Sequence, residues 1–154
     1  MPLQDYTTKV APEQTAGDIV ALLARKKAVA ILMDYDGNGQ VVAVSWKSRT
    51  PHGDIPFTLP INVEAVHKVL IKQYHAHQVP AVATTPEQAR RVAWRITYDW
   101  VKAQMALLES EMVTLEQLFL PYMVTRPGET LYERMLANGF KMLGPGNKEE
   151  VDGR

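Results

Sequence analysis

The stretch AVAILMDYDGNGQVVAVSW, residues 28–46, decides the fold of this 154-residue chain. An apolar run of strand length covers residues 28–33, and a second one covers residues 41–46. Between them, residues 36–39 read Asp-Gly-Asn-Gly, and these residue types tolerate the left-handed backbone angles of tight turns. Two such runs around a turn rich in Gly and Asn predict a β-hairpin.

A third strand is expected after the hairpin. Residues 47–54 form a polar loop, and over residues 55–61 apolar side chains alternate with two prolines and a threonine. Proline cannot donate a backbone hydrogen bond, so prolines at alternate positions are typical of an edge strand. Together the three runs predict a small three-stranded antiparallel meander sheet.

Helix start signals divide the rest of the chain. Four threonines are each followed three residues later by Asp, Gln or Glu, a spacing that lets both side chains satisfy free amides at a helix N-terminus. They are Thr15, Thr85, Thr114 and Thr130. Asn62 is a further candidate cap, for a helix over residues 63–77. The longest predicted helix runs from Pro86 to about Met112, and a last short one covers residues 131–137.

The resulting order, α-β-β-β-α-α with short C-terminal helices, predicts an α+β fold in which helices cover one face of the sheet. We expect a single domain over residues 1–140, because roughly 100–200 residues per domain is usual. Residues 141–154 contain Pro, Gly and charges with little to bury, and we expect them to form a flexible tail.

Composition excludes several classes of protein. The chain has no cysteine, which excludes disulfides, thiolate metal sites and a cysteine nucleophile, and favours a reducing cytosol. No apolar run approaches the roughly 20 residues that span a bilayer, so no membrane partner is expected. The N-terminus lacks the basic and apolar regions of a signal peptide, and we therefore expect a cytoplasmic protein.

Two patterns suggest a metal site, and neither completes one. Residues 34–39 match the first six positions of a calcium loop, but position twelve is Ser45 instead of a bidentate Glu, so a turn is favoured over an ion site. Four histidines lie between residues 52 and 77, yet His75 and His77 would point about 200° apart on a helix. No metal or cofactor is predicted.

Catalytic constellations are also missing from the sequence. Its serines lie in no Gly-x-Ser-x-Gly elbow, and no Gly-Lys-Ser/Thr phosphate loop occurs. No pair of neighbouring carboxylates is set in an evident apolar pocket. We therefore expect no catalytic residues and a protein that is not an enzyme.

The long helix carries two neighbouring apolar stripes when its residues are placed at 100° steps. Such a wide apolar arc must pack on two sides, against the sheet and against a neighbouring helix or another subunit. The second stripe is therefore a candidate surface for self-association or for binding a host protein. Its interaction residues are Trp94, Val101, Met105 and Leu108.

The polar side of the same helix carries a cationic line with an aromatic ring in it: Arg91, Arg95, Tyr98 and Lys102. At the second strand, Trp46 adjoins Lys47 and Arg49. Cations suit phosphates and aromatic rings suit unstacked bases, so these residues are a candidate site for single-stranded nucleic acid. A solvated helix face is the alternative. The net charge is zero, but residues 25–102 hold eleven basic and six acidic side chains.

Three stretches carry a family resemblance: Val10-x-x-x-x-Thr15; Ala93-Trp-Arg95 with Trp100-Val-Lys-Ala-Gln104; and Glu116-x-x-Phe119-Leu-Pro-Tyr122 before Gly128-x-Thr130. Together they resemble a widespread set of small uncharacterised proteins carried by bacteriophages and prophages. The resemblance covers about residues 8–135 and implies a host cytoplasm and a role in phage replication, recombination or takeover. That set has no assigned activity, so it implies no site residue.

Two functions follow from these patterns. The leading hypothesis is a non-enzymatic phage-type accessory protein that binds single-stranded nucleic acid. The alternative is a protein-interaction module, either a homo-oligomer or an inhibitor of a host protein. The first needs Arg91 and Arg95 to be exposed, whereas the second needs Trp94 and Met105 to be exposed.

Overall fold

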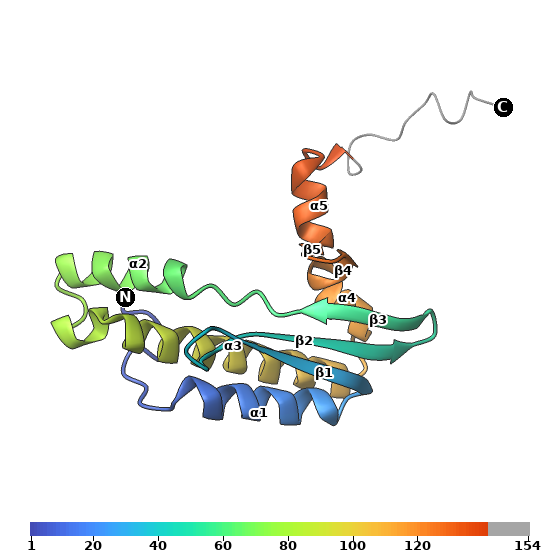
Figure 1. The fold of residues 1–154 in the computed structure, drawn as a ribbon, viewed down its shortest axis with the longest axis horizontal. Coiled ribbons are helices and arrows are strands. Elements are labelled where there is room, and N and C mark those ends of the chain that lie inside the picture. The colour runs from blue at the N-terminus through green and yellow to red at the C-terminus, as the bar shows by residue number, and fades with distance from the viewer. Residues whose placement is uncertain (142–154) are drawn as a thin grey trace.

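The computed structural model describes residues 1–141. Within them, five α-helices and a three-stranded antiparallel sheet form an α+β fold, as the sequence predicts (Figure 1). In chain order the elements are α1 (Pro12–Ala24), β1 (Ala28–Tyr35), β2 (Val41–Thr50), β3 (Gly53–Thr58), α2 (Val63–His75), the 3₁₀ helix η1 (Ala81–Thr84), α3 (Pro86–Glu109), α4 (Leu115–Phe119), the 3₁₀ helix η2 (Leu120–Tyr122), β4 (Val124–Arg126), β5 (Glu129–Thr130) and α5 (Leu131–Ala137).

The main sheet is the predicted meander, in the order β1-β2-β3. The prediction of a polar loop over residues 47–54 is wrong, because β2 continues to Thr50 and β3 begins at Gly53, so most of these residues pair across the two strands. Ile31 of β1 pairs with Trp46 of β2, and Trp46 pairs in turn with Phe57 of β3. Residues directly opposite each other on neighbouring strands point to the same face of the sheet, so these three side chains share one face. Beyond β3, Phe57 forms a single bridge with Met123, which ties the C-terminal part of the chain to the sheet.

Asp36 closes the turn between β1 and β2. Its Oδ1 accepts hydrogen bonds from the backbone amides of Asn38 at 2.8 Å and Gln40 at 3.0 Å. The bond from Gln40, then that from Asn38, hold the pKa of the Asp36 carboxyl below its usual value. Gly39 has φ of 74°, which glycine adopts without strain. The predicted hairpin is confirmed.

The main core lies between the sheet and two helices that cover one of its faces. Ile19 and Leu23 of α1 and Trp94 and Val101 of α3 are almost completely buried against it, together with Trp46. Figure 1 shows α1 and α3 running along the same side of the sheet. Aromatic rings close the core toward α4, with the Trp46–Phe57, Trp46–Phe119 and Trp100–Phe119 centroids 5.3, 5.2 and 5.6 Å apart.

A second, smaller core joins α2, η1 and the N-terminal half of α3. Leu70 of α2 and Val92 of α3 are fully buried there with Ala83 of η1. Leu3 and Tyr6 from the start of the chain pack against the same cluster. Residues before α1 therefore belong to the folded body.

Helix starts match the predicted threonine signals in three cases out of four. Thr85, Thr114 and Thr130 each accept a hydrogen bond from the backbone amide three residues later, and the last two form complete capping boxes. Thr15 was the wrong choice, because α1 begins earlier, at Pro12, behind Ala11. Proline suits the first position of a helix, since the amide that it lacks has no partner there.

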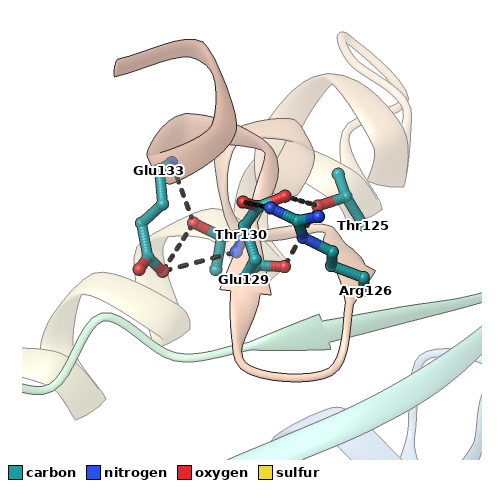
Figure 2. Close-up of polar contacts among 5 residues, drawn as sticks. All are labelled: Thr125, Arg126, Glu129, Thr130 and Glu133. Atoms are coloured by element: carbon teal, nitrogen blue, oxygen red, sulfur yellow. Dashed lines mark hydrogen bonds and ion pairs between the residues drawn. The ribbon is translucent and has the colours of Figure 1, made fainter. Parts of the chain in front are cut away.

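The C-terminal residues of the described chain form a separate arm. It consists of the hairpin β4–β5 and α5, and Figure 1 shows α5 standing away from the sheet. Figure 2 shows what joins its parts: Thr125 and Arg126 bind the Glu129 carboxylate, and Thr130 and Glu133 cap α5. Except for Lys141, the tail predicted over residues 141–154 lies outside the described residues.

Candidate nucleic-acid interface

The apolar stripe proposed as an interaction surface lies inside the protein. Trp94 and Val101 are fully buried and Met105 is 4% exposed, while Leu108 packs against the same core. The physical reason is that α3 is the central helix, with the sheet and α1 on one side and α2 on another. Its wide apolar arc is therefore covered by this chain's own elements, and the expectation that Trp94 and Met105 face outward is wrong.

Trp46 is also a core residue. Its ring stacks on Phe57, is 3% exposed, and donates a hydrogen bond from Nε1 to the buried Oγ of Ser48 at 3.0 Å. A nucleic-acid base cannot reach it in this fold. Alternation along β2 explains the contrast with its neighbour, because Lys47 points to the opposite face and is exposed.

The cationic line of α3 is partly buried and surrounded by carboxylates. The Arg95 guanidinium lies over the Tyr98 ring at 4.3 Å from its centroid and pairs with Asp18 of α1 at 3.7 Å. The carboxyls of Asp5 and Asp99 lie beside it as well. Acidic neighbours weaken the field that Arg95 presents to a phosphate.

Arg91 and Lys102 complete that line. Arg91 is half-buried and donates from Nη1 to Gln88 Oε1 at 3.1 Å, within its own helix. Lys102 is exposed. This face of α3 consequently offers little unpaired positive charge to a polyanion.

Lys47 and Arg49 lie on the other side of the sheet from α3. Lys47 is flanked across the strands by Ala30 and Pro56, and Arg49 pairs with Asp54 at 3.4 Å near the end of β2. The structure therefore does not bring the β2 cations and the α3 line to one surface, because the sheet and its core separate them.

Other cations join Lys47 and Arg49 instead. The backbone amide of Arg49 donates to the carbonyl of Lys27 at 3.0 Å, which holds the α1–β1 connection against the end of β2. Lys27 sits in the left-handed region, at φ of 65°. Arg25, Lys27, Lys47 and Arg49 are all exposed, and we call these four residues the cationic end.

Sequence reasoning missed the contribution of residues 25–27, because it counted them in the charge balance of residues 25–102 and assigned them to no site. A signal for it did exist. A hairpin closed at residues 36–39 pairs β1 with β2, and after register shifts near both ends of β1 the pairing places Ala28 opposite Ser48. The cations just before β1 must then lie next to Arg49.

A cavity of about 610 Å³ opens beside the cationic end. The α1–β1 connection and the turn after β2 form one wall, and the segment from the end of α3 into α4 forms the other. Apolar side chains contribute to the lining, among them Pro51, Val113 and Leu115. The site thus combines positive charge at its rim with an apolar interior.

The far wall of this cavity is acidic. Glu109, Glu111 and Glu116 line it, and Glu109 pairs with Lys26 at 3.1 Å. The Lys26 side chain is therefore engaged in an ion pair between the end of α1 and the end of α3. An anion entering the cavity is attracted to one wall and repelled by the other, which sets its orientation.

No protein-family model matches the chain, and comparisons with curated proteins and with solved structures gave no match either. Among residues 1–141, no three His, Cys, Asp or Glu side chains are placed so that they could hold a metal ion. Within the same residues, every helix is too short or too polar to cross a lipid bilayer.

Proposed function

We propose that this protein is a non-enzymatic, phage-type accessory protein that binds single-stranded nucleic acid in the host cytoplasm. The observation that carries the proposal is the cationic end, where Arg25, Lys27 and Arg49 line a partly apolar cavity and Lys47 lies two residues before Arg49 on the same face of β2. This interface replaces the composite of β2 and α3 residues expected from the sequence.

Phosphates of the strand lie along the exposed cations of this end. Each phosphate that a Lys or Arg neutralises releases counterions, which for single strands changes the logarithmic salt slope of the binding constant by about −0.7. Four contacts therefore imply a slope of about −3. The acidic far wall keeps the phosphates on the cationic rim.

A single strand fits this site better than a duplex does. The cavity beside the cations is concave and has apolar side chains, so it can receive an unstacked base that a double helix keeps inside. Leu115 is 8% exposed and belongs to the main core, which makes that side of the cavity rigid. Apolar and shape contacts of this kind imply weak sequence preference.

Fluorescence anisotropy with a labelled single-stranded oligonucleotide at about 50 mM salt tests the proposal. The double variant Lys47→Gln/Arg49→Gln should weaken binding by about tenfold or more and make the salt slope shallower by about 1.4. Arg91→Gln/Lys102→Gln removes the same charge from α3 and should change the affinity by less than about twofold.

Two outcomes of this experiment count against the proposal. Absence of binding at low salt, or an affinity indifferent to salt, would exclude a phosphate-dominated interface. Equal losses in both double variants would indicate a general effect of net charge and not a site at the cationic end.

A protein-interaction module is the second candidate, through a different surface from the one expected. On the arm, Tyr132, Leu136 and Phe140 are 50%, 54% and 36% exposed, and the rings of Tyr132 and Phe140 lie 6.1 Å apart. Such a patch suits a second copy of the chain or a host protein. Light scattering and a pull-down with Leu136→Glu as the control test it; a strict monomer that retains no partner contradicts it.

A further inference from the structure

The first eight residues form a strap across α2 and α3, which we call the N-terminal strap. The backbone amide of Leu3 donates to Gln73 Oε1 of α2 at 2.9 Å. Gln88 Nε2 of α3 donates to the carbonyls of Tyr6 at 2.9 Å and Thr8 at 2.8 Å. With Leu3 and Tyr6 packed on the second core, the strap is held by side chains from both helices.

Asp5 lies at the centre of the strap in an unusual environment. Its backbone is in the left-handed region, at φ of 60°, which is uncommon for a residue other than glycine. Its Oδ2 is buried without a hydrogen-bond donor. Its carboxyl is within hydrogen-bonding reach of the Asp99 carboxyl on α3, and Gln4 donates from Nε2 to Asp99 Oδ2 at 2.7 Å.

A proton shared by the two carboxyls removes their repulsion and supplies the missing hydrogen-bond donor. A buried carboxylate oxygen that faces another carboxylate is repelled and has no donor, whereas a protonated carboxyl supplies the missing hydrogen bond. Burial, and then the hydrogen bond and the charge of Asp99, raise the pKa of Asp5 to about 6, while Arg95 and Gln4 oppose the shift.

We propose that Asp5 and Asp99 share one proton and that its loss loosens the N-terminal strap from α2 and α3. The groups that face Asp5 are Asp99 and Arg95 from α3, with Arg95 also paired to Asp18 of α1. From α2, the strap's hydrogen-bond partner is Gln73, which is uncharged. The single positive charge of Arg95 is thus shared by three carboxyls once both members of the pair ionise.

The raised pKa of Asp5 determines how closure of the strap depends on pH. An acid whose pKa is higher in the closed strap binds its proton more tightly there, so closure is favoured at low pH and weakens as pH rises through about 6. Near pH 5 Leu3 and Tyr6 of the strap stay packed on the second core. Near pH 8 the strap opens more often and exposes the part of that core which Leu3 and Tyr6 cover.

Hydrogen exchange followed by NMR on the full chain tests whether proton loss from the Asp5–Asp99 pair loosens the N-terminal strap. Protection factors for the amides of Leu3, Tyr6 and Thr8, corrected for intrinsic exchange rates, should fall by about tenfold between pH 5 and pH 8. Amides in the middle of α3 should keep theirs. Asp5→Asn should abolish the pH dependence, and Asn accepts the left-handed backbone of this position.

Two further variants distinguish the effect of the Asp5–Asp99 pair from the effect of removing any carboxylate near Arg95. Asp99→Asn removes the like charge but leaves Asp5 buried, so it should reduce the pH dependence of strap protection without abolishing it. Asp18→Asn removes a carboxylate beside Arg95 without touching Asp5 and should keep the wild-type dependence. Equal strap protection at both pH values in the wild type, or an unchanged dependence in Asp5→Asn, would overturn the proposal.

Discussion

The hydroxyl of Thr15 is fully buried in α1 and has no hydrogen-bond partner. Valine has nearly the same shape and a similar helix propensity, but no polar atom to leave unpaired. Thr15→Val should therefore raise the free energy of unfolding by about 1 kcal/mol. Urea denaturation measures this as a higher midpoint with an unchanged slope.

Thr85 provides the matched comparison, because its hydroxyl caps α3 by accepting from the Gln88 amide at 3.1 Å. Thr85→Val removes that cap and should lower the free energy of unfolding by about 1 kcal/mol. The same Thr-to-Val substitution should therefore raise the free energy of unfolding at Thr15 and lower it at Thr85, although the two sequence motifs are similar. A loss of stability in Thr15→Val would show that its hydroxyl has a hydrogen-bond partner, such as a buried water.

At the scale of elements, the arm depends on one carboxylate. Glu129 accepts from Thr125 Oγ1 and from Arg126 Nη2, each at 2.9 Å, and joins the two strands of the short hairpin (Figure 2). The Thr125 hydrogen bond first, with Arg126 contributing, holds the pKa of Glu129 below its usual value of 4.5. This contribution is complete above that value and is lost as pH falls below it.

Acidification should consequently open the arm before the sheet. The Leu131 amide, which donates to the Met123 carbonyl at 2.8 Å, should lose protection from exchange as the pH falls below the usual range of a glutamate carboxyl and Glu129 gains a proton. Glu129→Gln should show reduced protection already at neutral pH. Amides within α3 serve as the internal reference, and an arm that stays protected in both cases contradicts the prediction.

Local signals predicted most of the elements. The hairpin at residues 28–46 and the helices that begin after Thr85, Thr114 and Thr130 follow from turn chemistry and capping, which depend on neighbours in sequence. The start of α1 did not follow, because the spacing of Thr15 and Asp18 imitates a capping box. Only the packing of Thr15 into the core distinguishes it from a true cap.

The candidate site could be predicted only in part, because it depends on how the elements pack together. Whether Trp46 or Trp94 faces solvent is decided by which elements cover them, and periodicity alone does not tell that the sheet and α1 cover the Trp94 side of α3. Lys47 and Arg49 were identified, but their distance from Arg91 depends on the thickness of the folded layers. The proximity of Lys27 to Arg49 required the strand register as well.

For the whole molecule, Phe119 is the residue that closes the main core. Its ring is fully buried, with centroids 5.2 Å from Trp46, 6.1 Å from Phe57 and 5.6 Å from Trp100. Phe119→Ala should lower the free energy of unfolding by about 3–5 kcal/mol. Urea denaturation, followed by tryptophan fluorescence, measures the loss.

Leu136→Ala is the control for that prediction. Leu136 is 54% exposed on the arm, and its truncation should change the free energy of unfolding by less than about 0.5 kcal/mol. Similar losses in both variants would mean that the arm belongs to the cooperative core. The structure instead gives α5 no buried residue.

The ring contact between Trp46 and Phe119 also has a consequence for synthesis. The two residues are about 70 positions apart, and ribosomes add roughly 5–20 residues per second, so the hairpin emerges several seconds before its aromatic partner exists. During that interval the Trp46 side of the nascent sheet lacks Phe119 and the α3 residues that cover it. A chaperone that binds exposed strands should therefore engage nascent chains that end between β3 and α4.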